Sequence, residues 1–276
     1  MDYPAAFSLA GLRTKRAVRL SDIDDVRAWF QDRIAERVVR AGAATTYRDP
    51  LVGFARAGDP RFEALRRRVP GHLAPHDLLP RARTVCAFFL PFHPQVVRAN
   101  ASGSAASEVW ARAYVETNAL LADVCASLVD SLREMGVGAA WEPPTHNFDP
   151  VRLVSAWSHK SAAYIAGLGR FGHHHMLITK AGCAGRLGSL ALDADLEPTR
   201  PARGSYCAFD RGCRACVRRC PVGALTEEGL DRQRCYAQCL ANDARFSKWL
   251  ADVCGKCVIG PCAYRPARDQ GAKEGT

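Results

Sequence analysis

The sequence predicts an α+β protein in which a layered α/β domain, residues 1–197, is followed by a small cysteine-rich domain, residues 198–276. Three observations support this division. Helix-like and strand-like segments alternate up to about residue 196, which indicates layers packed around one core. The proline-rich link EPTRPARG, residues 197–204, then changes the character of the chain. Nine of the twelve cysteines fall between Cys207 and Cys262, so they serve a local purpose.

The composition excludes several classes of protein. With 276 residues, 48% hydrophobic and 24% charged, the chain can bury a sizeable core and is not disordered. It has no uncharged apolar stretch of about 18 residues, and Asp2 stands where a signal peptide would be cationic, so we expect a cytoplasmic protein without a membrane span. In that reducing compartment, clustered cysteines are more often metal ligands than disulfides. The net charge of +10 is weak evidence for nucleic acid, because the run Arg66 to Arg68 is too short for a binding arm.

The first half of the chain contains two predicted helices and two predicted strands. Residues 21–40 have apolar side chains at helical spacing and Ser21 as a candidate N-cap. Residues 81–92 form a β-rich apolar run that Pro91 interrupts. A long helix is predicted from Ser107, a second candidate N-cap, to Met135, and Gly136 would end it. Residues 137–141 then form a short strand.

A third helix is predicted over residues 149–166. Asp149 would be its N-cap, Pro150 would occupy its first position, and Gly167 lies just beyond its end. Strands are predicted at residues 176–179 and 187–192, joined by the glycine-rich turn KAGCAGRLG.

The first cysteine group ends in the spacing C-x2-C-x3-C-P, which is typical of bacterial ferredoxins with two [4Fe-4S] clusters. It comprises Cys207, Cys213, Cys216 and Cys220, and Pro221 follows the last of them. Proline turns the chain away, so that the thiolate before it reaches the neighbouring cluster. Asp210 occupies the place where such runs usually begin with a cysteine, and we assign that role to Cys207.

The second cysteine group supplies the remaining ligands of two clusters. Ferredoxin-like pairing assigns Cys207, Cys213, Cys216 and Cys262 to one cluster and Cys220, Cys235, Cys254 and Cys257 to the other. Cys239 is then spare: it lies four residues after Cys235 and either replaces it or is simply buried. The alternative is a pair of four-cysteine zinc sites, although zinc ribbons have no need of the C-x3-C-P ending.

The segment Gly167 to Gly172 satisfies the pattern G-x-G-x-x-G, but its context is wrong for dinucleotide binding. That motif needs a strand before it and a helix after it, whereas here a helix-like segment precedes and a strand-like segment follows. The glycines still indicate a backbone pressed close to something. Of the adjacent histidines, His173 to His175, we expect one or two to line a pocket.

These motifs together resemble epoxyqueuosine reductases. The resemblance rests on AGLGRFGHHHMLIT at residues 166–179, on Gly182, Gly185 and Gly188 in the next turn, and on CRACVRRCPVGAL at residues 213–225. It extends over roughly residues 80–265 and is closest to a short branch, without C-terminal helical repeats, that carries WSHK and PTHNFD (residues 157–160 and 144–149).

The resemblance implies a fold, cofactors and partners. It implies a nitroreductase-like α/β domain that holds a base-off cobamide above a ferredoxin-like domain with two [4Fe-4S] clusters, as in the related reductive dehalogenases. The cobamide, or another planar cofactor such as a flavin, would contact Ala166, Gly167, Gly169, Gly172, His173, His174 and Gly188. The substrate would be a small molecule or linked to tRNA, and an electron donor such as flavodoxin or ferredoxin would reduce the clusters.

Three residues are candidates for the proton donor. The family's donor aspartate would fall on Leu153 here, and the nearest acid is Asp149. Asp149 is either that acid or only a helix cap, and His146 and His159 are alternative donors because imidazole titrates near neutral pH.

The sequence therefore favours an iron–sulfur oxidoreductase that removes oxygen or a halide reductively. Two other functions remain open: an electron-transfer or activator protein with no substrate of its own, and a zinc-stabilised RNA-binding module.

Overall fold

The fold mixes helices with small antiparallel sheets, which confirms the α+β class. The computed structural model describes residues 19–145, 147–246 and 250–267. The strands are β1 (Leu51–Arg56), β2 (Thr84–Pro91), β3 (Ala139–Trp141), β4 (Phe148–Asp149), β5 (Val154–Ser155), β6 (Gly169–Phe171), β7 (Leu177–Thr179) and β8 (Gly185–Leu192). The α-helices are α1 (Val26–Arg40), α2 (Pro60–Arg68), α3 (Pro75–Leu78), α4 (Pro94–Ala99), α5 (Glu108–Glu134), α6 (His159–Ile165), α7 (Ala215–Arg218) and α8 (Arg232–Asp243). Short 3-10 helices are η1 (Leu20–Asp22), η2 (Phe209–Arg211), η3 (Lys256–Val258) and η4 (Pro261–Ala263).

The main sheet has the order β1-β2-β8-β3, and each pair of neighbouring strands is antiparallel. Every residue of β2 is buried. An interior strand shows this pattern when both faces of its sheet are covered, because successive side chains point to opposite faces. Apart from Thr84, the sequence of β2 is accordingly apolar instead of alternating.

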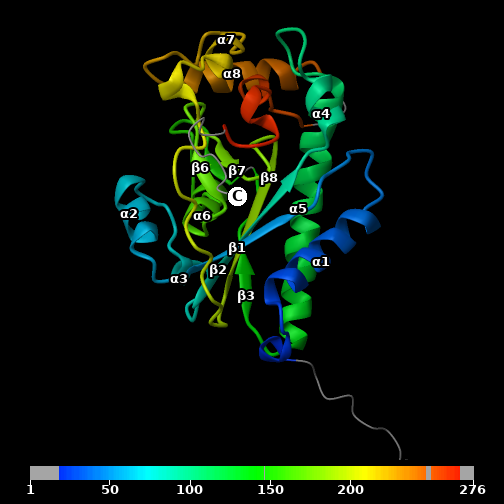
Figure 1. Ribbon diagram of the computed structural model, residues 1–276, viewed down its shortest axis with the longest axis vertical. Coiled ribbons are helices and arrows are strands. Elements are labelled where there is room, and N and C mark those ends of the chain that lie inside the picture. Colours follow the sequence, from blue (N-terminus) through cyan, green and yellow to red (C-terminus); the bar gives the residue numbers. More distant parts are fainter. Residues whose placement is uncertain (1–18, 146, 247–249, 268–276) are drawn as a thin grey trace, which may run out of the picture.

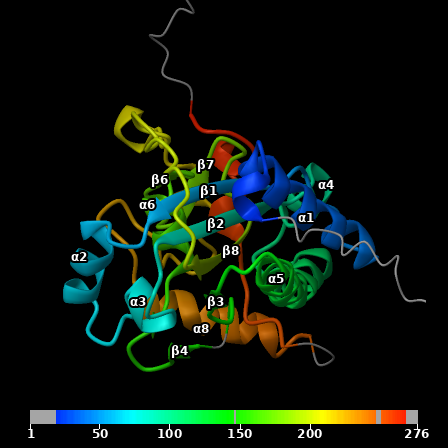
Figure 2. The same cartoon turned by 90° about the horizontal axis from the view of Figure 1, so that it is seen from below.

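Helices cover the two faces of this sheet (Figures 1 and 2). On one face, Phe88 of β2 packs in a core with Phe30 of α1 and Leu121 of α5. On the other face, Val85 of β2 packs in a second core with Ala162 of α6. The sheet is thus the middle layer of a three-layer arrangement.

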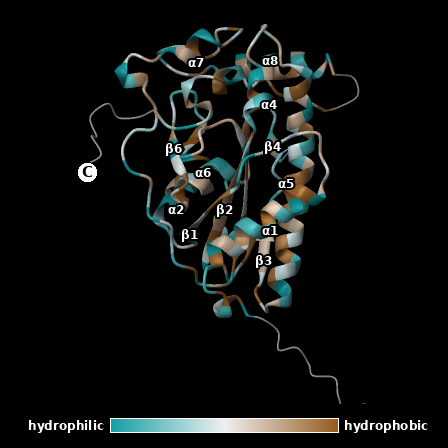
Figure 3. Cartoon of the chain, turned by 45° about the vertical axis from the view of Figure 1, so that its right-hand side comes forward, coloured by the Kyte–Doolittle hydropathy of each residue, from teal (hydrophilic) through white to brown (hydrophobic). Residues whose placement is uncertain are grey.

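The long helix α5 agrees with its prediction at both ends. The Ser107 hydroxyl accepts a hydrogen bond from the backbone N–H of Trp110 at 3.2 Å, and Gly136 follows the helix with a left-handed φ of 77°. Hydrophobic and hydrophilic segments alternate along its ribbon in Figure 3, as an amphipathic helix requires. The predicted strands at residues 81–92, 137–141, 176–179 and 187–192 are confirmed with small shifts of their ends.

Two helix predictions need correction. The helix placed at residues 21–40 begins only at Val26, because the Asp25 carboxylate accepts a hydrogen bond from the N–H of Ala28 at 2.9 Å. The helix placed at residues 149–166 was wrong in its first half. There β4 and β5 form a small hairpin, Leu153 has a left-handed φ of 53°, and Ser158 is the N-cap of α6.

The cysteine-rich segment lies across one end of the main sheet (Figure 1). It shares a core with the rest of the chain, in which Val258 and Ala263 pack with Phe92, Trp110 and Ile178. The boundary predicted at residues 197 and 198 stays a prediction. None of the helices in the described ranges is long and apolar enough to cross a membrane.

Candidate metal centre and adjoining cavity

The turn between β7 and β8 holds the cysteine-rich segment in place. The N–H of Cys183 donates to the carbonyl of Cys262 at 3.0 Å, and the N–H of Ala184 donates to the carbonyl of Ala263 at 3.1 Å. Gly182 makes this contact sterically feasible. Its φ is 86°, and a Cβ there would lie 2.2 Å from the carbonyl oxygen of Ala263.

Four cysteines of the predicted first cluster line one small cavity. They are Cys207, Cys213, Cys216 and Cys262. They come from different parts of the segment: Cys216 belongs to α7 and Cys262 to η4, whereas Cys207 and Cys213 flank η2. Cys257 and His174 also line this cavity.

The predicted ligands of the second cluster line a larger cavity of about 360 Å³. They are Cys220, Cys235, Cys254 and Cys257, and Cys239 lies beside them. Because Cys257 lines both cavities, the two groups of thiols are neighbours. Burial raises the pKa of Cys216, Cys254 and Cys257, so these thiols need bound cations to become thiolates.

Cys235 and Cys239 lie one turn apart on α8 and differ in their electrostatics. A hydrogen bond from Cys239 lowers the pKa of Cys235 to about 7. The same hydrogen bond, together with burial, raises the pKa of Cys239. Of this pair, Cys235 therefore ionises more readily than Cys239, and the ligand and spare roles assigned to them stay predictions.

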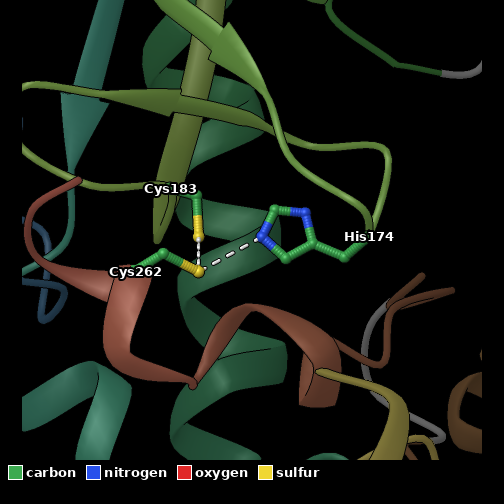
Figure 4. Close-up of side chains that lie close together, drawn as sticks. All are labelled: His174, Cys183 and Cys262. Carbon is green, nitrogen blue, oxygen red and sulfur yellow. Dashed lines mark hydrogen bonds between the residues drawn. The ribbon is translucent and has the colours of Figure 1, made fainter. Parts of the chain in front are cut away.

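A further buried thiol, Cys183, meets the first cluster group (Figure 4). Its Sγ lies 3.8 Å from the Sγ of Cys262, and the Nε2 of His174 lies 3.3 Å from the same sulfur. These three ligand atoms are close enough to one another to share one metal ion. Hydrogen bonds from Cys183 and His174 lower the pKa of Cys262 to about 5. No role was predicted for Cys183, because a lone cysteine in a glycine-rich turn carries no spacing signal.

The glycines of the G-x-G-x-x-G segment pack against the chain itself. A Cβ on Gly169 would lie 2.1 Å from the carbonyl oxygen of Ile178, and one on Gly167 would lie 2.7 Å from that of Arg200. Outside this segment, a Cβ on Gly188 would lie 2.3 Å from the Phe88 ring. The predicted close approach of the backbone at these glycines is confirmed, and the groups that it approaches belong to this chain. Contact of these residues with a cofactor stays a prediction.

The remaining predicted cofactor-binding residues lie in different parts of the structure. His174 lines both cysteine cavities. His173 stacks on Phe209 with ring centroids 3.6 Å apart, and its Nε2 lies 2.7 Å from the carbonyl of Thr226, so it joins the loop to the cysteine-rich segment. A Cβ on Gly172 would lie 2.9 Å from the His174 ring. Ala166 is fully buried next to Gly53.

A third cavity of about 280 Å³ adjoins the second cluster group. The two cavities share four lining residues: Lys160, Met176, Gly185 and Arg186. Lys160 comes from α6 and Arg186 from β8, and they place two cations at the junction. Asn147 also lines the third cavity, and its Nδ2 is buried without a hydrogen-bond partner. Lys160, Arg186 and Asn147 were not predicted as site residues, because isolated polar side chains carry no spacing signal.

His159 lines the third cavity as a neutral imidazole. The indole N–H of Trp157 donates to the hydroxyl of Ser189 at 2.9 Å, and Ser189 can donate onward to the His159 Nδ1 at 2.8 Å. Burial lowers the pKa of His159 to about 4. At neutral pH the residue therefore holds one proton, on Nε2, which faces the carbonyl of Pro143 at 3.5 Å.

Asp149 is the last residue of β4, and its side chain caps the turn of the β4–β5 hairpin. Its carboxylate accepts hydrogen bonds from the N–H groups of Arg152 and Val151, at 3.0 and 2.8 Å, and these bonds lower its pKa. This environment keeps the group ionised and agrees with a capping role, here in a turn and not in a helix. His146, the other predicted donor, lies outside the described residues.

The fold is similar to that of several proteins of known structure. The structure is similar to an epoxyqueuosine reductase (TM-score 0.53, 18% identity, 86% of this chain and 66% of the other) and to the epoxyqueuosine reductase of Streptococcus thermophilus (0.51, 16%, 86% and 67%). It is also similar to a reductive dehalogenase described in connection with B12-dependent dehalogenation (0.51, 19%, 75% and 29%). No protein-family model matches the chain, and no curated protein matches it.

These neighbours confirm, at the level of the fold, the relationship inferred from the motifs. The chain spans about two thirds of the length of the epoxyqueuosine reductases and under one third of the dehalogenase. At identities of 16–19%, the likeness concerns the fold alone.

Proposed function

We propose that this chain is an iron–sulfur oxidoreductase that carries two [4Fe-4S] clusters and removes oxygen or a halide from a substrate reductively. One observation carries the proposal: seven of the eight predicted ligands line only the cavity of the set that ferredoxin-like spacing assigns to them, and the eighth, Cys257, lines both neighbouring cavities. The fold shared with reductases supports it. Thiolate ligands of this kind persist in a reducing compartment such as the cytoplasm.

The donor sets fit the clusters. Cys207, Cys213, Cys216 and Cys262 would hold the first, and Cys220, Cys235, Cys254 and Cys257 the second. The buried thiols with raised pKa values require positive charge beside them, which iron supplies. The clusters would supply single electrons at low potential.

The third cavity is the proposed site of the planar cofactor and substrate. Its buried Asn147 amide has no acceptor among the described residues, so a ligand that offers one would satisfy it. Lys160 and Arg186 would orient electron-rich groups of that ligand at the edge of the second cluster site. A cobamide bound there would supply low-potential cobalt chemistry, with epoxyqueuosine in tRNA as the first substrate to test.

Lys160 is the proton source that this geometry favours among the described cavity residues. Its ammonium group lines the junction of the two cavities, and its Nζ donates to the carbonyl of His175 at 3.3 Å. Burial lowers its pKa, which makes its proton easier to release. Asp149 is held ionised, and His159 is neutral at the pH of the cell.

Anaerobic purification followed by iron, sulfide, zinc, cobalt and flavin analysis tests the proposal. We expect about eight irons and eight sulfides per chain, with Cys216→Ala and Cys254→Ala each losing about half of the iron. Zinc in place of iron and sulfide would overturn it in favour of a zinc-stabilised module. A protein with both clusters that binds neither cobalamin nor flavin would instead be an electron carrier without its own substrate.

A further inference from the structure

A shallow basic hollow lies on the outer side of the first cluster cavity. Its lining residues are Ala215, Arg218, Arg219, Ile259, Gly260 and Pro261. Three of these, Ala215, Gly260 and Pro261, also line the cavity of Cys207, Cys213, Cys216 and Cys262. The same residues thus form a wall with the hollow on one side and the predicted cluster site on the other.

This wall is thin because its side chains are short. A Cβ added to Gly260 would lie 3.4 Å from the Cβ of Ala215, so the two residues pack closely without large groups between them. Alanine, glycine and proline place little atomic volume between the surface and the thiols. A redox partner seated in the hollow would therefore come close to the first cluster.

The hollow is positively charged. Arg218 and Arg219 are exposed, and none of the six lining residues is acidic. The neighbouring Arg214 is neutralised by Glu227 at 2.8 Å. Within the described ranges, Arg218 and Arg219 have no ion pair, and Arg219 donates only to the carbonyl of Ala101 at 3.5 Å. These two guanidinium groups are available to a partner's carboxylates.

We propose that an acidic one-electron carrier protein docks in this hollow and reduces the first cluster. The inference rests on the proposed function. The reduced carrier loses one electron, the oxidised cluster gains it, and no covalent bond forms or breaks. Complementary charge would raise the rate of encounter, and this rate would fall as salt screens the arginines.

The test uses the cluster-loaded full chain and chemically reduced flavodoxin as the acidic donor. Bleaching of the cluster absorbance, followed by stopped flow, gives the second-order rate constant. We expect Arg218→Glu with Arg219→Glu to lower this constant at least about tenfold at low salt and to abolish its salt dependence. Reduction by dithionite, a small anionic reagent that needs no docking site, should fall by a much smaller factor.

The matched control is Arg67→Glu with Arg68→Glu, an exposed arginine pair at the end of α2. It makes the same change of charge elsewhere and should leave at least half of the rate. Equal rates in wild type and the Arg218/Arg219 variant, or equal losses in both variants, would overturn the inference. The inference would also be overturned if the Arg218/Arg219 variant bound tRNA more weakly than wild type but was reduced by flavodoxin at the wild-type rate.

Two further measurements keep the test decisive. If the charge-reversal variant loses iron, Arg218→Gln with Arg219→Gln replaces it and should lower the rate by a smaller factor. A wild-type rate that does not fall with salt would also overturn the docking site. Wild-type protein without iron and sulfide would overturn the proposed function instead.

Discussion

The Nε2 of His174 lies 3.3 Å from the Sγ of Cys262, and the backbone fixes which ring nitrogen carries the proton. The N–H of Met176 donates to the His174 Nδ1 at 3.1 Å, so in the neutral ring the proton sits on Nε2 and points at the sulfur. Figure 4 shows the ring and the buried Cys183 approaching this sulfur from two sides. A predicted cluster ligand thus receives hydrogen bonds from the layered part of the fold.

Removal of this hydrogen bond should make the first cluster harder to reduce. Hydrogen bonds to cluster sulfurs stabilise the more negative, reduced state. We expect His174→Ala to lower the reduction potential by about 30–60 mV, about 0.7–1.4 kcal/mol for one electron. His174→Gln, which keeps an N–H donor, should recover part of the shift in an anaerobic redox titration. His173→Ala is the control, since that ring contacts Thr226 and Phe209, and a comparable shift there would contradict the assignment.

Single substitutions of Cys235 and Cys239 on α8 should distinguish a cluster ligand from a spare thiol. Because Cys235 has the lower pKa and Cys239 donates to it, Cys235→Ser should lose about half of the bound iron and Cys239→Ser should keep nearly all of it. Iron and sulfide per chain, measured after anaerobic purification, decide between them. The reverse pattern would make Cys239 the ligand.

Gly182→Ala should loosen the cysteine-rich segment from the β7–β8 turn. The new Cβ would meet the backbone of Ala263 and Tyr264 at 2.2–2.5 Å, which requires that segment to shift. We expect a loss of roughly 2–4 kcal/mol of unfolding free energy, measured by denaturant titration, together with loss of the first cluster. Gly42→Ala is matched, because its φ is also positive and a Cβ there meets nothing within 4 Å, so its loss should stay below about 2 kcal/mol. Equal losses would show that backbone conformation alone explains the effect.

The buried His159 should make the protein less stable in mild acid. Its pKa is lowered from 6.5 to about 4, so below pH 6.5 the unfolded chain binds a proton that the folded chain does not. Stability is therefore retained above pH 6.5 and lost as the pH falls toward 4. The loss from this group should reach roughly 2 kcal/mol between pH 6.5 and 5.

Denaturant titrations at several pH values test this effect. His159→Asn, which keeps a polar group near Ser189, should remove most of the difference. Substitution of the exposed His76 by Gln is the control and should leave the pH profile unchanged. A profile that is the same in wild type and the His159 variant would show that another group is responsible.

The sequence predicted features that depend on local chemistry. Ser107 and Gly136 delimit a helix because capping is decided within a few residues. The cysteine spacing predicted two sets of four thiols, with Cys220 and Cys262 each joining the set that is more distant in the chain, and this division stays a prediction. The apolar run of β2 indicated a strand. The predicted helix that begins at Asp149 was wrong, because a residue suited to an N-cap is equally suited to a tight turn, and only the pairing of β4 with β5 selects the turn.

By itself, then, the sequence determined the α+β class and the long helix, because each is encoded by neighbours in the chain. The tertiary structure alone decided that Cys183 and His174 meet Cys262, that Lys160 and Arg186 share a cavity edge, and that Asn147 lacks a partner. These residues are brought together by the packing of the cysteine-rich segment on the end of the sheet. Contacts between distant segments follow from how the layers pack, and no local spacing records them.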